Sequence, residues 1–230
     1  MKQLAALIII CAWYLPAFAQ GPDEDQLGAW YMYFFNKRFE QSPWGIQGDY
    51  QLRSWNFGSD LEQLLLRTGV TYSPKNAGVT FTLGYAHITT GAFGESTDTF
   101  TESRMYQEAL LPQKVGGRFL LTHRFRYEQR WVEDQDFRTR CRYNLFVNIP
   151  INNVQLTAKT VYIALYNEVF INGQRAIGDG RSVQIFDRNR AYMGVGYGLR
   201  ANLRMQCGWM LQTTNDWSKG QAQVSLHHNF

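Results

Sequence analysis

The sequence predicts an all-β fold: a closed antiparallel up-and-down transmembrane β-barrel of 10 or 12 strands, preceded by a cleavable signal peptide. Apolar and polar residues alternate along most of the chain, aromatic residues make up 15% of it, and its mean hydropathy is only -0.35. A chain that is rich in rings without being apolar overall needs one apolar face and one polar face. The alternation of a barrel strand supplies both faces.

The first residues predict export. A positive charge at Lys2, an apolar stretch over residues 4–15 and a small-x-small pattern at residues 17–19 are typical of a secretory leader. A membrane-spanning helix needs roughly 20 apolar residues, and this stretch is shorter. We therefore expect a signal peptide over residues 1–19 and an outer-membrane barrel domain over residues 20–230. The mature chain of about 210 residues suits one large all-β domain.

The segment 44–55 shows the alternation most clearly. Apolar side chains recur at every second position from Trp44 to Leu52, and the positions between them carry glycine or polar residues up to Arg53. In a pleated strand these two sets point to opposite faces. The pattern recurs along the chain with turn signals between its copies, as at residues 73–76, which is typical of an antiparallel meander.

The alternating segments number eleven, whereas single-chain bacterial barrels with both termini in the periplasm generally have an even number of strands. We therefore expect a miscount near the first segment, 27–36, and a barrel of 10 or 12 strands. If the last strand runs down to the periplasm, the richer loops at 90–100 and 172–182 share the outer end of the barrel.

A lipid bilayer explains this pattern better than a soluble core does. In hydrocarbon every backbone N–H and C=O must be paired within the protein, so only helices or closed barrels can span it. Barrel strands of ~9–11 residues with apolar residues outside and polar residues inside match the observed segments. A soluble sandwich would not need four consecutive charged positions on its inward face, such as those from Arg124 to Arg130.

The last segment alternates up to the final residue, with Ala222, Val224, Leu226, His228 and Phe230 on one face. A terminal aromatic residue on such a strand resembles the assembly signal of bacterial outer-membrane barrels. We therefore expect the cell outer membrane of a Gram-negative bacterium as the location. The expected partners are outer-membrane lipids, lipopolysaccharide and, through the strand ending at Phe230, the barrel-assembly machinery.

Short motifs along most of the chain carry a resemblance to a known family. They are Leu65, Arg67, Gly69, Val70 and Tyr72 paired with residues 83–86 (LGYA), then 104–108 (RMYQE), 123–130, 166–170 (YNEVF), 186–190 (FDRNR) and 194–197 (GVGY). With these motifs the mature chain resembles the uncharacterised outer-membrane barrel family labelled domain of unknown function 2490 (DUF2490). The resemblance implies a barrel and an outer-membrane address, and it implies no activity.

The parity of the strands predicts a cluster of charged side chains in the lumen. Its members are Arg104, Glu108, Arg124, Arg126, Glu128, Arg130, Arg138, Arg140, Arg142, Glu168 and Arg190. They either pair across neighbouring strands and brace the wall, or form a basic constriction that favours anionic solutes. Because arginine outnumbers glutamate, some guanidinium groups must face water, loop acids such as Asp179 and Asp187, or a ligand.

The function predicted from the sequence is a porin-like, narrow Arg-lined conduit or a binding barrel for small anionic solutes. An outer-membrane lipid-modifying hydrolase, a closed structural barrel without transport and a soluble periplasmic barrel are the alternatives. For a hydrolase, Ser225 and His227 share one face, whereas His87 and His123 fall on apolar faces. No third member of a triad can be assigned, so we assign no catalytic residue.

No cofactor, metal or nucleic acid is predicted. Cys141 and Cys207 lie in alternating stretches far from any CxxC spacing, so they form neither a disulfide framework nor a metal site. The net charge of +4 and the pI near 9.0 accompany no nucleic-acid module. We expect a basic lumen or attraction to anionic lipid head groups instead.

Tryptophan and glycine form two further patterns. Trp44, Trp55, Trp131, Trp209 and Trp217 lie near strand ends or loops, and we expect a girdle at the two head-group levels. Parity places Trp44 and Trp209 outside the barrel. The glycines at 194, 196 and 198 alternate within a strand that no helix follows, so close packing or lumen space explains them better than a phosphate-binding loop.

Overall fold

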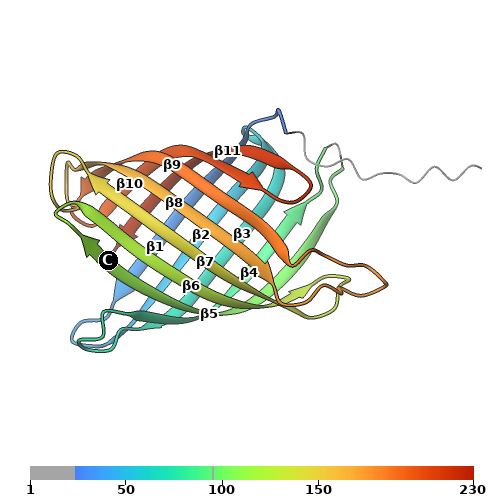
Figure 1. The fold of residues 1–230 in the computed structure, drawn as a ribbon, viewed down its shortest axis with the longest axis horizontal. Helices are drawn as coiled ribbons and strands as arrows, with labels where there is room; N and C mark the ends of the chain where they lie inside the picture. The colour runs from blue at the N-terminus through green and yellow to red at the C-terminus, as the bar shows by residue number, and fades with distance from the viewer. Residues whose placement is uncertain (1–23, 95) are drawn as a thin grey trace, which may run out of the picture.

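The chain winds into a closed barrel in which each strand pairs with its neighbours in sequence, and β1 meets β11 to close the sheet (Figure 1). The computed structural model describes residues 24–94 and 96–230, so the expected signal peptide over residues 1–19 lies outside the described residues. The eleven strands are β1 Gly28–Arg38, β2 Trp44–Asn56, β3 Ser59–Tyr72, β4 Thr80–Gly91, β5 Thr99–Val115, β6 Phe119–Val132, β7 Arg138–Pro150, β8 Val161–Asn172, β9 Phe186–Arg200, β10 Leu203–Thr213 and β11 Ser218–Asn229.

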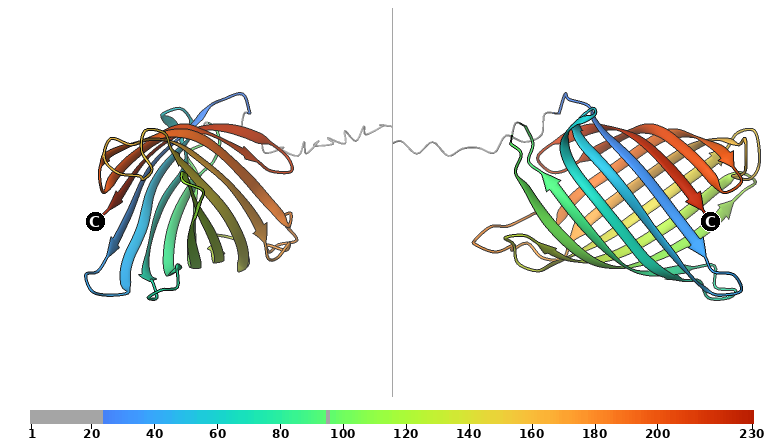
Figure 2. Two further views of the ribbon diagram at one scale, coloured as in Figure 1. Left: turned by 60° about the vertical axis from the view of Figure 1, so that its left-hand side comes forward. Right: turned by 180° about the vertical axis from the view of Figure 1, so that it is seen from behind.

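The expected count of 10 or 12 strands is wrong, because all eleven alternating segments form strands. With an odd number, β1 and β11 run in the same direction, and they pair in parallel from Gly28↔Gln221 to Asn36↔Asn229. The closing pair therefore departs from the expected antiparallel arrangement. The even-number rule assumes that the first strand begins at the barrel end where the last one finishes, and here these points lie at opposite ends (Figure 2).

The connections define two ends of the barrel. At one, which we name the loop end, residues 173–185 join β8 to β9, and the β4–β5 connection lies at the same end. At the other, the turn end, residues 201–202 join β9 to β10. The two richer loops expected at 90–100 and 172–182 therefore share one end, because every connection from an even strand to an odd strand does.

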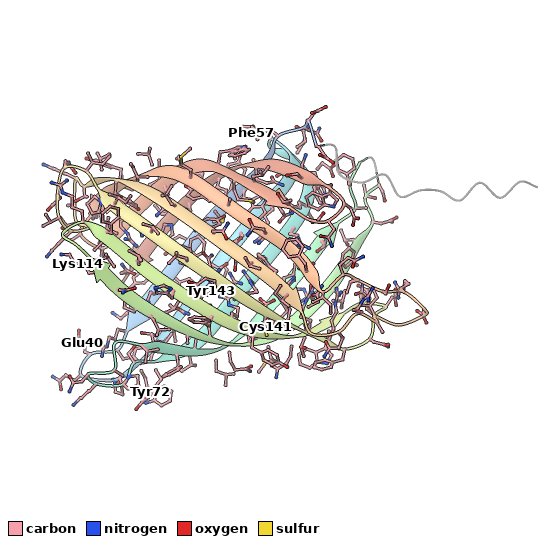
Figure 3. The ribbon with its side chains drawn as sticks, in the orientation of Figure 1. Glu40, Phe57, Tyr72, Lys114, Cys141 and Tyr143 are labelled. Carbon is pink, nitrogen blue, oxygen red and sulfur yellow. The ribbon has the colours of Figure 1, made fainter. Side chains whose placement is uncertain are left out.

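The barrel wall is apolar outside and polar inside. On β3 the side chains of Leu66, Val70 and Tyr72 are exposed, whereas Arg67 and Thr71 between them are buried. Figure 3 shows side chains along the whole outer wall, Tyr72 and the exposed Cys141 among them.

Within the described ranges, 24–94 and 96–230, no helix is long and apolar enough to cross a membrane.

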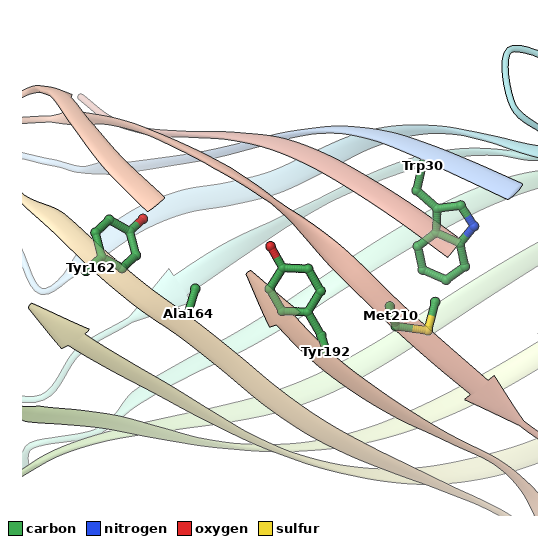
Figure 4. Packing of buried hydrophobic residues seen from close by; sticks show 5 residues of the cluster. All are labelled: Trp30, Tyr162, Ala164, Tyr192 and Met210. Carbon is green, nitrogen blue, oxygen red and sulfur yellow. The ribbon is translucent and has the colours of Figure 1, made fainter. Parts of the chain in front are cut away.

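Part of the interior is apolar and lies across β1, β8, β9 and β10. Trp30, Tyr162, Ala164, Tyr192 and Met210 form a buried cluster (Figure 4). The Tyr162 hydroxyl oxygen accepts a hydrogen bond from Gln206 Nε2 at 3.0 Å. These side chains fill part of the barrel beside its charged residues, since Trp30 Nε1 donates a hydrogen bond to Glu62 at 2.8 Å.

Inward-facing glycines make room for these rings. A Cβ atom at Gly196 would lie 2.1 Å from Cζ of Tyr162, and one at Gly84 would lie 2.2 Å from Cζ of Tyr106. Each tyrosine therefore lies flat against the wall over a glycine of the neighbouring strand. The expected role of Gly196 in close packing follows directly from this contact.

The substitution Gly196→Ala should therefore force the Tyr162 ring out of its position. We expect a loss of about 1–3 kcal/mol in the free energy of unfolding, as measured by urea titration. Gly117→Ala is the matched control, because nothing lies within 4 Å of a Cβ atom there and its φ is not positive. Equal stabilities of the two variants would contradict the ring-over-glycine contact.

Candidate functional site

The barrel interior holds an unusual number of buried charges. Among the described residues, nine arginines and one lysine are buried together with six carboxylates: Arg53, Arg67, Arg104, Arg126, Arg130, Arg138, Arg140, Arg142, Arg190 and Lys219 against Asp49, Glu62, Glu102, Glu108, Glu128 and Glu168. Charges removed from water are tolerated when they are paired or hydrogen bonded. The cations outnumber the anions, so pairing cannot be complete.

All eleven charged residues that the sequence predicts for the lumen lie inside the wall. Ten of them are at most 8% exposed, and the side chain of Arg124 is 13% exposed. Six of the buried charged residues, from β2, β3, β5 and β11, were not predicted from the sequence: Asp49, Arg53, Glu62, Arg67, Glu102 and Lys219. The signal was present for Asp49 and Arg53, because both occupy the polar positions of the alternating segment 44–55.

Glu128 is the centre of the larger ion-pair network. Its carboxylate accepts hydrogen bonds from Arg140 Nη2 at 2.7 Å and from Arg142 Nη1 at 2.6 Å, and the residue is 1% exposed. Arg142 also donates to Glu168 at 2.5 Å, and Arg124 donates to the same carboxylate at 2.7 Å. Arg142 therefore links two carboxylates that belong to different strands.

Two smaller groups of ion pairs also lie inside the barrel. Glu102 holds both Arg104 and Arg130, each through a nitrogen–oxygen distance of 2.5 Å. Asp49 accepts two bonds from Arg67, at 2.7 and 2.9 Å, in the bidentate arrangement that suits a guanidinium group.

The two loop acids named from the sequence behave differently. Arg140 Nη1 lies 2.7 Å from Asp187, which therefore joins the buried cluster. Asp179 instead pairs with Arg181 at 3.3 Å, and both of these side chains are largely exposed. Only Asp187 therefore neutralises part of the excess positive charge inside the barrel.

Three buried arginines of the described residues form no ion pair: Arg53, Arg138 and Arg190. Within residues 24–94 and 96–230, neither Arg53 nor Arg190 forms an ion pair; Arg53 donates to Gln51 and Gln63, and Arg190 donates to Gln212. Their guanidinium carbons lie over the Trp30 ring, 3.8 Å and 4.7 Å from its centroid. Cation–π contacts stabilise such groups without neutralising them, so their positive charge remains available to an anion.

Two cavities occupy the interior. The loop-end cavity, of about 240 Å³, is lined by nine arginines and two glutamates, and the turn-end cavity, of about 350 Å³, by seven arginines and three acids. Four arginines line both cavities and so stand between them: Arg53, Arg67, Arg142 and Arg190. Trp55 and Trp217 also line the loop-end cavity, so these two do not form part of an outer girdle.

Two residues that line the loop-end cavity carry buried polar atoms without hydrogen-bond partners. In the described part of the chain, Arg138 Nε and Gln212 Nε2 are buried and lack a hydrogen-bond acceptor, and both residues line this cavity. An unsatisfied buried N–H costs about 1–3 kcal/mol, more when the group is charged. An anion or water in the cavity would supply the missing acceptors.

The histidines fall into two groups. Ser225 Oγ lies 3.0 Å from His227 Nε2, and both residues line the turn-end cavity. His123 instead lies on the outer face, where its ring nitrogens contact the Tyr143 hydroxyl and Gln113 Oε1. His87 is also exposed on the outer face. The structure therefore brings together one Ser–His pair and leaves His87 and His123 on the outer wall, while the fourth histidine, His228, contacts the Tyr33 hydroxyl through Nδ1 at 3.1 Å.

The fold and its interior define a class of protein: a closed β-barrel with an apolar outer wall and an Arg-rich interior divided into two cavities. The chain belongs to the family described as protein of unknown function (DUF2490), whose profile matches residues 27–223. The family membership predicted from short motifs is thereby confirmed, and the match runs from the start of β1 into β11. Comparison with curated proteins finds no match.

Removal of the Glu128 carboxylate should destabilise the barrel. Glu128→Gln keeps the side-chain shape but leaves Arg140 and Arg142 each without one partner, so we expect a loss of about 3–5 kcal/mol in the free energy of unfolding. Asp179→Asn, which breaks the exposed pair with Arg181, should cost less than about 1 kcal/mol. Urea titration measures both, and a small loss for Glu128→Gln would show that its ion pairs do not stabilise the barrel.

Proposed function

We propose that this protein is a barrel of the Gram-negative outer membrane that binds small anionic solutes in its loop-end cavity and forms no open channel. The observation that carries the proposal is the lining of that cavity, where nine arginines face two glutamates. Such a wall attracts anions and repels cations at short range.

The outer wall supports a membrane location. Large apolar side chains are exposed along the strands, for example Tyr50, Leu83, Met193 and Trp209, each at least 44% exposed. A wall of this size that faced water would be an aggregation hazard, whereas hydrocarbon solvates it. Outer-membrane lipids and lipopolysaccharide are therefore the partners that we propose for this face.

The partition of the interior favours binding over conduction. Of the four arginines between the cavities, Arg67 is held by Asp49, and Arg142 is held by Glu128 and Glu168. Side chains fixed by several charge-assisted bonds do not swing aside readily. A solute that enters the loop-end cavity is therefore stopped by the four arginines that separate the two cavities.

The native thiol of Cys207 provides a test of the membrane location, because its reaction with a maleimide can be measured directly. It lies midway along β10 with its side chain exposed on the outer wall. In a Cys141→Ala background, we expect Cys207 in intact outer-membrane vesicles to resist a charged maleimide, because hydrocarbon excludes the reagent, and to react after denaturation. An added Asp179→Cys in the exposed loop should react in intact vesicles. Equal reaction rates at both positions would support the soluble alternative.

Anion binding tests the cavity. Isothermal titration with inorganic phosphate, sulfate and a small dicarboxylate should give binding that weakens about 10-fold or more in Arg190→Gln, since charge-assisted bonds contribute roughly 1.5–3 kcal/mol. The control is Arg118→Gln, because Arg118 contacts the backbone oxygens of Pro150 and Ile151 away from the cavity.

A planar-bilayer recording separates the remaining alternatives. We expect no single-channel current from the wild type. Current steps would favour the narrow conduit instead, and the absence of both current and anion binding would favour a closed structural barrel.

A further inference from the structure

The turn-end cavity contains a nucleophile and a base in contact. Ser225 and His227 are successive inward positions on β11, and their side chains form the 3.0 Å contact between Oγ and Nε2. The His227 ring stacks on Phe34 of β1, with centroids 4.8 Å apart and planes 10° from parallel. A stacked ring cannot turn freely, so Phe34 fixes the orientation of the His227 ring. In a hydrolase triad, a third polar residue holds the histidine ring in this way.

Two residues that line the same cavity carry unpaired N–H donors. Gln223, the preceding inward residue of β11, accepts a hydrogen bond from the Tyr166 hydroxyl on Oε1, and its Nε2 is buried without a partner. Arg204 Nε, on the residue of β10 that pairs with His227, is also buried without a partner in the described part of the chain. Donors of this kind stabilise the negative oxygen that forms when a hydroxyl attacks a carbonyl.

We propose that Ser225 and His227 form a catalytic pair that hydrolyses small carboxylic esters bearing an anionic group. This activity belongs to the turn-end cavity and does not depend on anion binding at the loop end. The sequence alone placed the two residues on one face; the structure adds their contact, the stacked ring, the cavity and the unpaired donors.

The reaction balances with water as the only co-reactant. Ser225 Oγ adds to the ester carbonyl carbon while its proton passes to His227 Nε2, and the carbonyl oxygen becomes an oxyanion. The carbon–oxygen bond to the alcohol then breaks, and the alcohol leaves with the proton from His227. Water attacks the acyl-serine by the same route, which releases the carboxylic acid and restores the Ser225 hydroxyl.

The cavity wall indicates the substrate class. Seven arginines against three acids favour a negative charge on the substrate, and Arg204 has no ion pair within residues 24–94 and 96–230. Met32, Phe34 and Leu110 supply apolar surface for a short carbon chain. A volume of about 350 Å³ lies within the range of small-molecule sites and near its lower limit, which favours a small ester.

A serine-directed probe tests the nucleophile. Folded wild-type protein treated with a fluorophosphonate should carry the label on Ser225, and the label should be absent from Ser225→Ala. His123→Gln, on the outer face, is the matched control for His227→Gln. The former should keep full labelling, whereas the latter should slow it at least about 100-fold, because general-base catalysis contributes 10²–10⁴-fold.

Turnover tests the substrate class. We expect the 4-nitrophenyl monoester of succinate, which is anionic, to exceed 4-nitrophenyl butyrate in kcat/KM by about 10-fold, the effect of one charge-assisted contact, and Arg204→Gln to abolish that preference. In a background in which Cys141 and Cys207 are replaced by alanine, Ser225→Cys keeps a nucleophile at this position, so it should be labelled by a thiol-directed ester probe even if Ser225→Ala fails to fold.

Three results would overturn the proposal in whole or in part. An unlabelled wild type with a folded β spectrum, or labelling that persists in Ser225→Ala, would exclude Ser225 as the nucleophile. Equal turnover of the two esters would exclude the anionic specificity while leaving the catalytic pair.

Discussion

The structure depends on one constraint: charges enclosed by a barrel must find their partners inside it. Glu128 meets this constraint by holding Arg140 and Arg142, and Arg142 carries the network on to Glu168. Because these residues come from β6, β7 and β8, the ion pairs brace the wall across strands that backbone hydrogen bonds already join. The arginines that find no carboxylate give the interior its chemical character.

Much of the barrel could be predicted from a period of two, and so could the inward parity of residues such as Arg126 and Glu128. The strand number could not, although the alternating segments number eleven. The expectation of an even strand number comes from barrels with both chain ends on one side, and it was preferred to the count of eleven segments. Nothing in the alternation reveals that β1 and β11 pair in parallel. Long-range pairing leaves no local signal in a single strand.

The sequence could predict the candidate sites only in part as well. Parity could place Ser225 and His227 on one face, but it could not show that Phe34 stacks on the histidine from the far end of the chain. It also could not divide the lumen, because the division requires both Arg53 and Arg190 to lie against the ring of Trp30. Such meetings depend on the shear and closure of the whole sheet rather than on any segment.

The parallel seam between β1 and β11 gives the molecule a polarity that an even-stranded barrel lacks. Each strand of the seam enters at the loop end and leaves at the turn end, so peptides fused ahead of Gly28 and behind Asn229 would emerge from opposite mouths. One polypeptide could thereby present two attachments to two different environments. A barrel with its ends on the same side would bring both attachments to a single mouth.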